Sequence, residues 1–287
     1  MLYRVLGRSG LKVSAVSLGG AYLMGPDPER AAENAEAVVR RAAELGINYI
    51  DTAPLYGESE ILLGGALAAV GAPFEVATKV GFDPENFDYR RDSVLASLER
   101  SLQRLGIGQL SVAQIHEVNL AGWERIMEPG GTLEGLRAAQ ERGFCRYIGI
   151  TGRAIPLLAR LAASGEFDTL LCYHDYHPCA SLAAQEVLPR AAEQKMGVVM
   201  ATVLAGGLFT HGPAQAQALA ALEPEQRARA EGVLAAMGDE GVPLPQAAFS
   251  WVLRDPRVSS VSSGAADPGQ LEEVAVAGDT LPTADTV

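Results

Sequence analysis

Four polar side chains could do chemistry together: Asp51, Tyr56, Lys79 and His116. Three of them stand in or directly after a short apolar run, and Tyr56 follows Asp51 within the same loop. Lys79 is one of only three lysines, and an unpaired ammonium inside an apolar run would be costly to desolvate. Lys79 therefore needs an anion, and we expect Asp51 on a neighbouring strand to supply it.

The expected chemistry of this set is proton transfer by a phenol. A nearby ammonium and a hydrogen-bonding imidazole both stabilise a phenolate, so Lys79 and His116 would make Tyr56 a usable acid or base. Asp51 would hold Lys79 charged and oriented, and His116 would hydrogen-bond a substrate oxygen and set its angle. Taken singly, a turn-capping Asp51, a loop Tyr56 or a core His116 is the commoner situation. Together, the four residues favour an active site.

The elements that must position these residues follow a regular pattern. Short apolar runs alternate with longer segments that carry apolar residues at helical spacing, which is typical of successive βα units. The eight candidate strands are 14–18, 47–50, 75–80, 110–115, 146–150, 168–172, 197–202 and 257–262. The clearest candidate helices are 31–45, 91–105, 132–142 and 181–195.

This pattern predicts one α/β domain over residues 1–287, folded as a (β/α)8 TIM barrel. Such a barrel needs about 250 residues and carries its chemistry at the carboxyl ends of the strands, where the four polar residues stand. The rival fold is a doubly wound nucleotide-binding sheet, whose first turn would read GxGxxG. The turn at 18–25 does not have that spacing, so we expect the barrel.

Three further features refine the predicted barrel. The runs 3–5 and 11–13 flank a Gly-Arg-Ser-Gly turn, which predicts an N-terminal β-hairpin. The gap at 203–256 is too long for one loop and one helix, so we expect an insertion after the seventh strand, at the functional end of the barrel. Several helical segments end at a glycine suited to a C-cap, namely Gly46, Gly106, Gly143 and Gly197.

Composition excludes several classes of partner. The net charge is −12 without a basic cluster, which argues against a nucleic-acid partner. The longest apolar stretch, 198–209, is too short to span a bilayer, and the first residues lack a signal-peptide pattern. Cys145, Cys172 and Cys179 have no metal-ligand spacing, so we expect buried thiols and no metal. We therefore expect a cytoplasmic protein without a membrane partner, either a monomer or a small homo-oligomer.

The sequence resembles the aldo-keto reductase family along nearly its whole length. The resemblance rests on Asp51-Thr52-Ala53 through Tyr56-Gly57, Ala77-Thr78-Lys79, Gln114-Ile115-His116 and Tyr147-Ile148-Gly149-Ile150-Thr151. All four positions of the family's catalytic tetrad hold the expected residue types. The resemblance implies a (β/α)8 barrel with a nicotinamide cofactor, NAD or NADP, across its mouth.

The resemblance also implies residues that bind this cofactor. Asp51 and Thr151 would lie near the nicotinamide and its ribose, Gly20 and Ala21 on the floor, and the segment Leu204 to Gly206 over the pyrophosphate. The full expected set is Gly20, Ala21, Asp51, Thr151, Tyr173, Thr202, Leu204, Gly206, Gly264, Ala265, Asp267, Gln270 and Glu273. Three positions depart from the family pattern: Gly152 replaces an Asn, Tyr173 a Gln, and Ala201 an aromatic residue that often stacks on the nicotinamide ring.

Within the family, the chain is most similar to aldose 1-dehydrogenases that act on L-galactose, L-fucose or related sugars. That similarity implies that Tyr56 removes a proton from the anomeric hydroxyl while a hydride leaves carbon 1, which yields a lactone. The expected substrate contacts are Tyr22, Tyr56, His116 and Glu117. Two alternatives stay open: a broad-range NAD(P)H-dependent reductase of aldehydes and ketones, and a catalytically weak cofactor-sensing regulatory subunit.

NAD is the expected preference over NADP. Relatives that use NADP typically carry a basic residue two places after the glycine that corresponds to Gly264, and here that place is Ala266. Residues 262–274 contain no Arg, Lys or His but include the acids Asp267, Glu272 and Glu273. The extra phosphate of NADP would meet like charge there. Two alternatives remain: the acids could merely favour a helix N-terminus, or an Arg of 203–256 could reach the site.

Overall fold

Eight parallel strands close into a barrel in the computed structural model, which describes residues 1–82, 87–238 and 241–279. Their order around the barrel is β10-β3-β4-β5-β6-β7-β8-β9. Their bounds are β3 Val16–Gly19, β4 Tyr49–Asp51, β5 Glu75–Val80, β6 Leu110–Ile115, β7 Cys145–Gly152, β8 Thr169–Tyr173, β9 Gly197–Ala201 and β10 Ser260–Ser263. The predicted (β/α)8 barrel is confirmed, and its eight strands lie where the apolar runs placed them, within three residues at either end.

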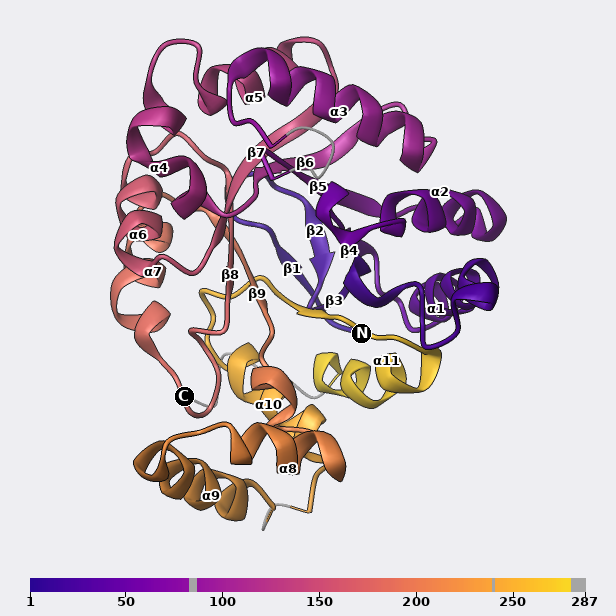
Figure 1. The fold of residues 1–287 in the computed structure, drawn as a ribbon, viewed down its shortest axis with the longest axis vertical. Helices are drawn as coiled ribbons and strands as arrows, with labels where there is room; N and C mark the ends of the chain where they lie inside the picture. Colours follow the sequence, from indigo (N-terminus) through magenta and orange to yellow (C-terminus); the bar gives the residue numbers. More distant parts are fainter. Residues whose placement is uncertain (83–86, 239–240, 280–287) are drawn as a thin grey trace.

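Helices surround the barrel, as Figure 1 shows. They are α1 Ala31–Glu44, α2 Ser59–Val70, α3 Arg91–Leu105, α4 Val118–Met127, α5 Thr132–Glu141, α6 Ile155–Ala163, α7 Leu182–Glu193, α8 Pro213–Ala220, α9 Pro224–Gly238, α10 Leu244–Leu253 and α11 Pro268–Ala275. The short 3-10 helices are η1 Gly20–Tyr22, η2 Pro28–Arg30, η3 Pro54–Tyr56, η4 Ala205–Gly207 and η5 Val276–Gly278. Among the described residues, no helix is long and apolar enough to cross a membrane.

The predicted insertion follows β9. It contributes η4, α8 and α9 before α10 returns the chain to the barrel. Helices α8 and α9 lie together at one end of the molecule, beside α10 (Figure 1). Helix α9 buries only Ala230. The insertion is thus a separate layer on the barrel end where the strands terminate.

The predicted hairpin is confirmed as β1 Tyr3–Val5 and β2 Lys12–Ser14, which pair antiparallel. Its apolar side chains Leu6, Leu11 and Val13 are buried in one cluster with Tyr49, Ala77, Val112, Leu171 and Val199, one residue from each of five barrel strands. The hairpin therefore closes the interior of the barrel from the end at which the strands begin. Within the described residues, the pocket that could admit a ligand lies at the opposite end.

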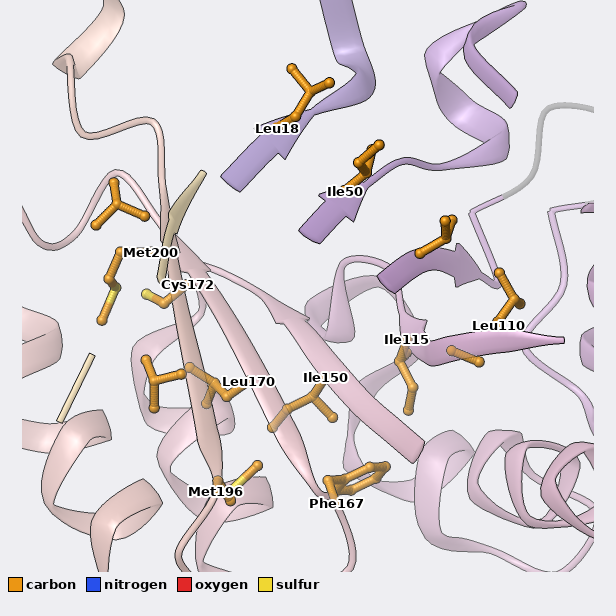
Figure 2. Packing of buried hydrophobic residues seen from close by; sticks show 14 of the residues in the cluster. Leu18, Ile50, Leu110, Ile115, Ile150, Phe167, Leu170, Cys172, Met196 and Met200 are labelled. Carbon is orange, nitrogen blue, oxygen red and sulfur yellow. The ribbon is translucent and has the colours of Figure 1, made fainter. Parts of the chain in front are cut away.

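A second, larger core lies between the strands and the helices. Strand side chains that point outward, such as Ile50, Ile115 and Ile150, are buried in it, together with Leu170 and Met200 (Figure 2). Successive side chains of a strand point to opposite faces. The outward direction of Ile50 and Ile115 therefore turns the residues that follow them, Asp51 and His116, toward the barrel axis.

Two sequence predictions need correction. Gly197 is not a helix C-cap: the left-handed residue there is Lys195, with φ 53°, and Gly197 begins β9. Gly197 is required for a packing reason, because an added Cβ would lie 2.5 Å from Cγ of Leu6 in the hairpin. Cys179 is only half-buried, whereas Cys145 and Cys172 are buried thiols as expected.

The buried carboxylate of Glu60 connects α2 to β5 and α3. Glu60, in the first turn of α2, is 1% exposed. Its Oε1 accepts a hydrogen bond from Thr78 Oγ1 at 2.5 Å, and its Oε2 lies 2.7 Å from Nε of Arg104. Tyr56 lies four residues before Glu60 and Lys79 directly follows Thr78, so this contact also fixes two of the candidate catalytic elements against each other.

We predict that Glu60→Ala lowers the free energy of unfolding by about 2 kcal/mol, because it removes a buried carboxylate that pairs with Arg104 and takes away the acceptor of the Thr78 hydroxyl. Urea titration followed by circular dichroism would measure the change. Glu33→Ala is the matched control, because Glu33 pairs with Arg30 at the exposed surface and surface pairs contribute little. Equal effects of the two substitutions would contradict the prediction.

Candidate active site

Strand alternation brings the predicted residues to one rim. Asp51 ends β4, Lys79 is the penultimate residue of β5, and His116 directly follows β6. Asp51 pairs with Ala77 in register, and Lys79 pairs with Gln114. Tyr56 lies on η3, the short 3-10 helix between β4 and α2. All four predicted catalytic residues line the same cavity.

Lys79 contacts three of its neighbours at this rim. Its Nζ donates to a carboxylate oxygen of Asp51, to the Thr52 carbonyl at 2.9 Å and to the Tyr56 hydroxyl at 3.2 Å. Lys79 as a whole residue is 1% exposed. The anion that the sequence required is therefore Asp51, as predicted, and the phenol oxygen of Tyr56 lies directly against a buried positive charge.

Gln114 is a site residue that sequence reasoning missed. Its side-chain amide donates to the second carboxylate oxygen of Asp51 at 2.7 Å, and it is buried. Asp51 is thus held from two sides, by Lys79 and by Gln114. The available signal was the spacing: Gln114 stands two residues before His116 and so shares its inward face.

Lys79 and His116 have different charge states in this site. Burial lowers the pKa of Lys79, but Asp51 and Tyr56 oppose it and the net change is upward, so the amine stays protonated. Burial, and secondarily the Lys79 ammonium, lower the pKa of His116 to about 2, so its imidazole is neutral. The rings of Tyr56 and His116 meet edge to face, with centroids 5.8 Å apart. Within the described residues, Nδ1 of His116 is buried without a hydrogen-bond partner.

This rim opens into a cavity of about 850 Å³. Sixteen of the eighteen predicted site residues line it: Ala21, Tyr22, Asp51, Tyr56, Lys79, His116, Glu117, Thr151, Tyr173, Thr202, Leu204, Gly206, Gly264, Ala265, Gln270 and Glu273. The two that do not are Gly20 and Asp267. The cavity extends from the strand ends to α11, so one elongated space joins nearly all of the predicted positions.

Gly20 is close-packed behind the cavity wall. Its carbonyl accepts a hydrogen bond from Ser59 Oγ at 2.7 Å, and Ser59 Oγ also lies 2.8 Å from Thr52 Oγ1. A Cβ added at Gly20 would lie 2.7 Å from Ser59 Oγ. Ser59, a buried residue that the sequence did not single out, therefore ties the β3 loop to the end of β4.

Three strand ends carry strained backbone. Glu117, His174 and Thr202 follow β6, β8 and β9, and each has a positive φ, at 53°, 66° and 55°. Non-glycine residues rarely adopt this conformation, and such strain concentrates at functional sites. All three residues line the cavity.

The far end of the cavity lies between η1 and the segment that leads into α11. The Tyr22 ring packs so closely on Gly264 that an added Cβ there would lie 2.8 Å from a ring carbon. Thr151, at the near end, donates its hydroxyl to the Ile115 carbonyl at 3.0 Å. Gln270 accepts a hydrogen bond from the Ala266 amide at 3.0 Å.

The three acids of this segment have different surroundings. Asp267 is the N-cap of α11 and accepts from the Gln270 amide. Glu272 pairs with Arg41 of α1 at 2.7 Å. Glu273 lines the cavity, 3.8 Å from Nε2 of His211, which belongs to the insertion and lines the cavity too.

The cavity wall fits an elongated nucleotide cofactor. Eight of its lining residues are glycine or alanine, among them Gly19, Ala21, Ala201, Gly206 and Gly264. Gly264 has no room for a Cβ, because the Tyr22 ring packs against it. A buried ammonium, a phenol and a neutral imidazole stand together at one end only, where a reacting group would lie.

Comparison with known proteins identifies the family. A profile of the aldo/keto reductase family matches residues 15–286. The chain belongs to the aldo/keto reductase family. It is an oxidoreductase of that family, whose members use nicotinamide cofactors.

Several aldo/keto reductase relatives are similar to most of the chain. L-galactose dehydrogenase from Arabidopsis thaliana is 32% identical, with 94% of this chain and 86% of the relative covered. D-threo-aldose 1-dehydrogenase from Pseudomonas sp is 27% identical, with 92% and 89% covered. A solved structure from Pseudomonas aeruginosa, named for the same family, superposes with a TM-score of 0.71 at 26% identity, covering 97% of this chain and 94% of that chain.

Proposed function

We propose that this aldo/keto reductase oxidises the anomeric carbon of an aldose of the L-galactose or L-fucose kind to a lactone, with Tyr56 as the general base. The observation that carries the proposal is the contact between Tyr56 and Lys79 at 3.2 Å, inside a cavity that also presents His116 and Glu117. It supplies a proton acceptor beside polar groups suited to a sugar. The names of two similar relatives, an L-galactose dehydrogenase and a D-threo-aldose 1-dehydrogenase, support the same substrate class.

The residues of the rim divide the work between them. The Lys79 ammonium stabilises the phenolate of Tyr56, which removes the proton from the anomeric hydroxyl. Neutral His116 hydrogen-bonds that substrate oxygen and orients it. Asp51, held by Gln114, keeps the ammonium in place. A bound nicotinamide cofactor would accept the hydride from carbon 1.

The cofactor would lie along the cavity lined by Ala21, Thr151, Leu204 and Gly264 and by Gln270. The aromatic ring that relatives often stack on the nicotinamide is absent at Ala201. Its register partner on β8 is Tyr173, which lines the same wall. We include Tyr173 in the proposed cofactor site on that basis. We also include Thr202, which directly follows Ala201 and lines the same cavity.

A panel of aldoses and simple aldehydes, assayed with each cofactor in both directions, tests the proposed activity. We expect the highest kcat/KM for oxidation of an aldose. Faster reduction of simple aldehydes than oxidation of any aldose would instead favour a broad-range reductase. Tight cofactor binding with negligible turnover on the whole panel would favour a cofactor-sensing subunit.

The proposed enzyme is expected to prefer NAD to NADP. No Arg lines the cavity in the described part of the chain, and its only lysine is Lys79 at the catalytic end. At the α11 end, Glu273 would oppose the extra phosphate of NADP, whereas a carboxylate can accept hydrogen bonds from the free ribose hydroxyls of NAD. His211 is the one basic group that the insertion brings to the cavity wall among the described residues. Steady-state kinetics should give a higher kcat/KM for NAD than for NADP.

A charge introduced at Ala266 tests where this selectivity lies. Ala266→Arg should narrow or reverse the NAD-to-NADP ratio of kcat/KM, because arginine would pair with the phosphate. Ala163→Arg, on the exposed end of α6 and away from the cavity, is the matched control. A wild-type preference for NADP would contradict the prediction.

A further inference from the structure

Glu117 is held in a conformation that its residue type does not favour. It follows His116 at the end of β6 with φ 53°, in the left-handed region. Its carbonyl accepts from the Leu120 amide at 2.8 Å, and Tyr89 donates its hydroxyl to the neighbouring His116 carbonyl at 2.6 Å. The surrounding structure therefore fixes this strained backbone, which sets the direction of the Glu117 side chain.

Tyr173 fixes the side chain itself. Its hydroxyl donates to Oε1 of Glu117 at 2.5 Å, across the cavity end from β8 to β6. Burial, and then this hydrogen bond, raise the pKa of Tyr173, so the phenol remains a donor throughout the neutral range. The carboxylate is thereby anchored through one oxygen. Its second oxygen has no protein hydrogen-bond donor among the described residues.

The remaining oxygen of this carboxylate is available to a ligand. Glu117 and Tyr173 line the cavity together with Tyr56 and His116. Within the residues that the structure describes, Glu117 is half-buried and has no cation within ion-pair distance. An acceptor that is partly desolvated and only half satisfied is best matched by a hydroxyl donor.

We propose that Glu117 is the residue that selects a polyhydroxylated substrate, by accepting hydrogen bonds from ring hydroxyls of the aldose beside its reacting carbon, and that Tyr173 is the residue that positions it. The proposal rests on the proposed aldose oxidation and adds the source of its selectivity. A substrate without hydroxyls would leave the carboxylate desolvated and unpaired. Sites built to hydrogen-bond a hydroxyl reject analogues that lack it far more strongly than apolar pockets discriminate by size.

Deoxy sugars provide the test. The aldose that the wild-type enzyme oxidises best is compared with its analogues that lack one hydroxyl at a time, and the discrimination factor is the ratio of the two kcat/KM values. We expect a factor of about ten or more for at least one analogue, as for loss of a hydrogen bond to a charged group. Glu117→Gln should lower that factor, because the neutral amide can only make a weaker hydrogen bond to the same hydroxyl than the charged carboxylate makes.

Tyr173→Phe separates positioning from direct contact. It should reduce the same discrimination factor and raise KM for the aldose more than it lowers kcat. In the double variant, Tyr173→Phe should add little to the effect of Glu117→Gln, because both act through one carboxylate. Additive effects of the two substitutions would overturn the positioning role of Tyr173.

Glu124→Gln, the same chemical change on the exposed face of α4 and outside the cavity, is the matched control. Glu117→Asp, which shortens the carboxylate, serves if Glu117→Gln does not fold, and should also lower the factor. Aldose oxidation with the discrimination factor unchanged in the Glu117 variants would overturn this inference alone. Failure of the wild-type enzyme to oxidise any aldose would overturn the proposed function and this inference together.

Discussion

Replacing Tyr56 by phenylalanine is expected to lower kcat for aldose oxidation by roughly 10²–10⁴ while the affinity for the cofactor changes little. The substitution keeps the ring, which meets His116 edge to face, and removes only the oxygen that contacts Lys79. The proposed general base is lost, but the cavity wall is not. Single-turnover kinetics would measure the rate of hydride transfer, and cofactor titration would measure the affinity.

Tyr3→Phe is the control for this experiment. Tyr3 is on the hairpin that closes the other end of the barrel, and the substitution removes a hydroxyl that donates to the Gly46 carbonyl. Turnover of the Tyr3→Phe variant should be unchanged. Near-normal turnover of the Tyr56 variant would show that this tyrosine is structural, and the proposed mechanism would fail.

Lys79→Met is expected to have the second large effect, a loss of roughly 10²–10³ in kcat, as for removal of other groups that stabilise developing charge. The ammonium is buried and its pKa is raised, so it stays charged where it would stabilise the proposed Tyr56 phenolate. Without it, the phenolate forms less readily. The pH at which oxidation reaches half its maximal rate should therefore move upward.

The double variant Asp51→Asn with Lys79→Met distinguishes electrostatic catalysis from damage to the fold. The single substitution leaves the Asp51 carboxylate buried with Gln114 as its remaining side-chain partner, which could destabilise the protein on its own. The double variant removes both charges. We expect it to stay slow and to keep the shifted pH profile. A profile like that of the wild type in an active variant would indicate that Lys79 only fills space beside Asp51.

The barrel and the positions of the four proposed catalytic residues could be predicted because their signals are local. Each strand is a contiguous apolar run, and a residue at its carboxyl end falls on the functional rim of any (β/α)8 barrel. Asp51, Lys79 and His116 could therefore be placed without knowing which side chains touch. A single buried lysine was enough to require Asp51 as its partner.

The partners of these residues depend on contacts that no local pattern encodes. Gln114 reaches Asp51 across 63 positions of sequence, and Tyr173 reaches Glu117 across 56. The second contact spans β7, which stands between β6 and β8 in the barrel, and Glu117 makes it from a left-handed backbone conformation that no local pattern predicts.

Gly197 shows the opposite error, in which a local rule gave the wrong reason for a residue. A glycine after a helical segment is typical of a C-cap. Here the close approach of the hairpin requires it, and that approach joins residue 6 to residue 197. The acids near α11 are likewise grouped by a local pattern, but they have different roles. Asp267 caps the helix and Glu272 pairs with Arg41. Of the three, Glu273 lines the cavity.

Isotope transfer from carbon 1 tests the proposed activity most directly. The enzyme is incubated with oxidised cofactor and an aldose that carries deuterium at carbon 1, and the reduced cofactor and the sugar product are analysed by mass spectrometry. The proposed mechanism predicts deuterium in the reduced cofactor and an equimolar amount of lactone, with both products suppressed in Tyr56→Phe. Reduced cofactor without deuterium, or no cofactor reduction by any aldose, would contradict it.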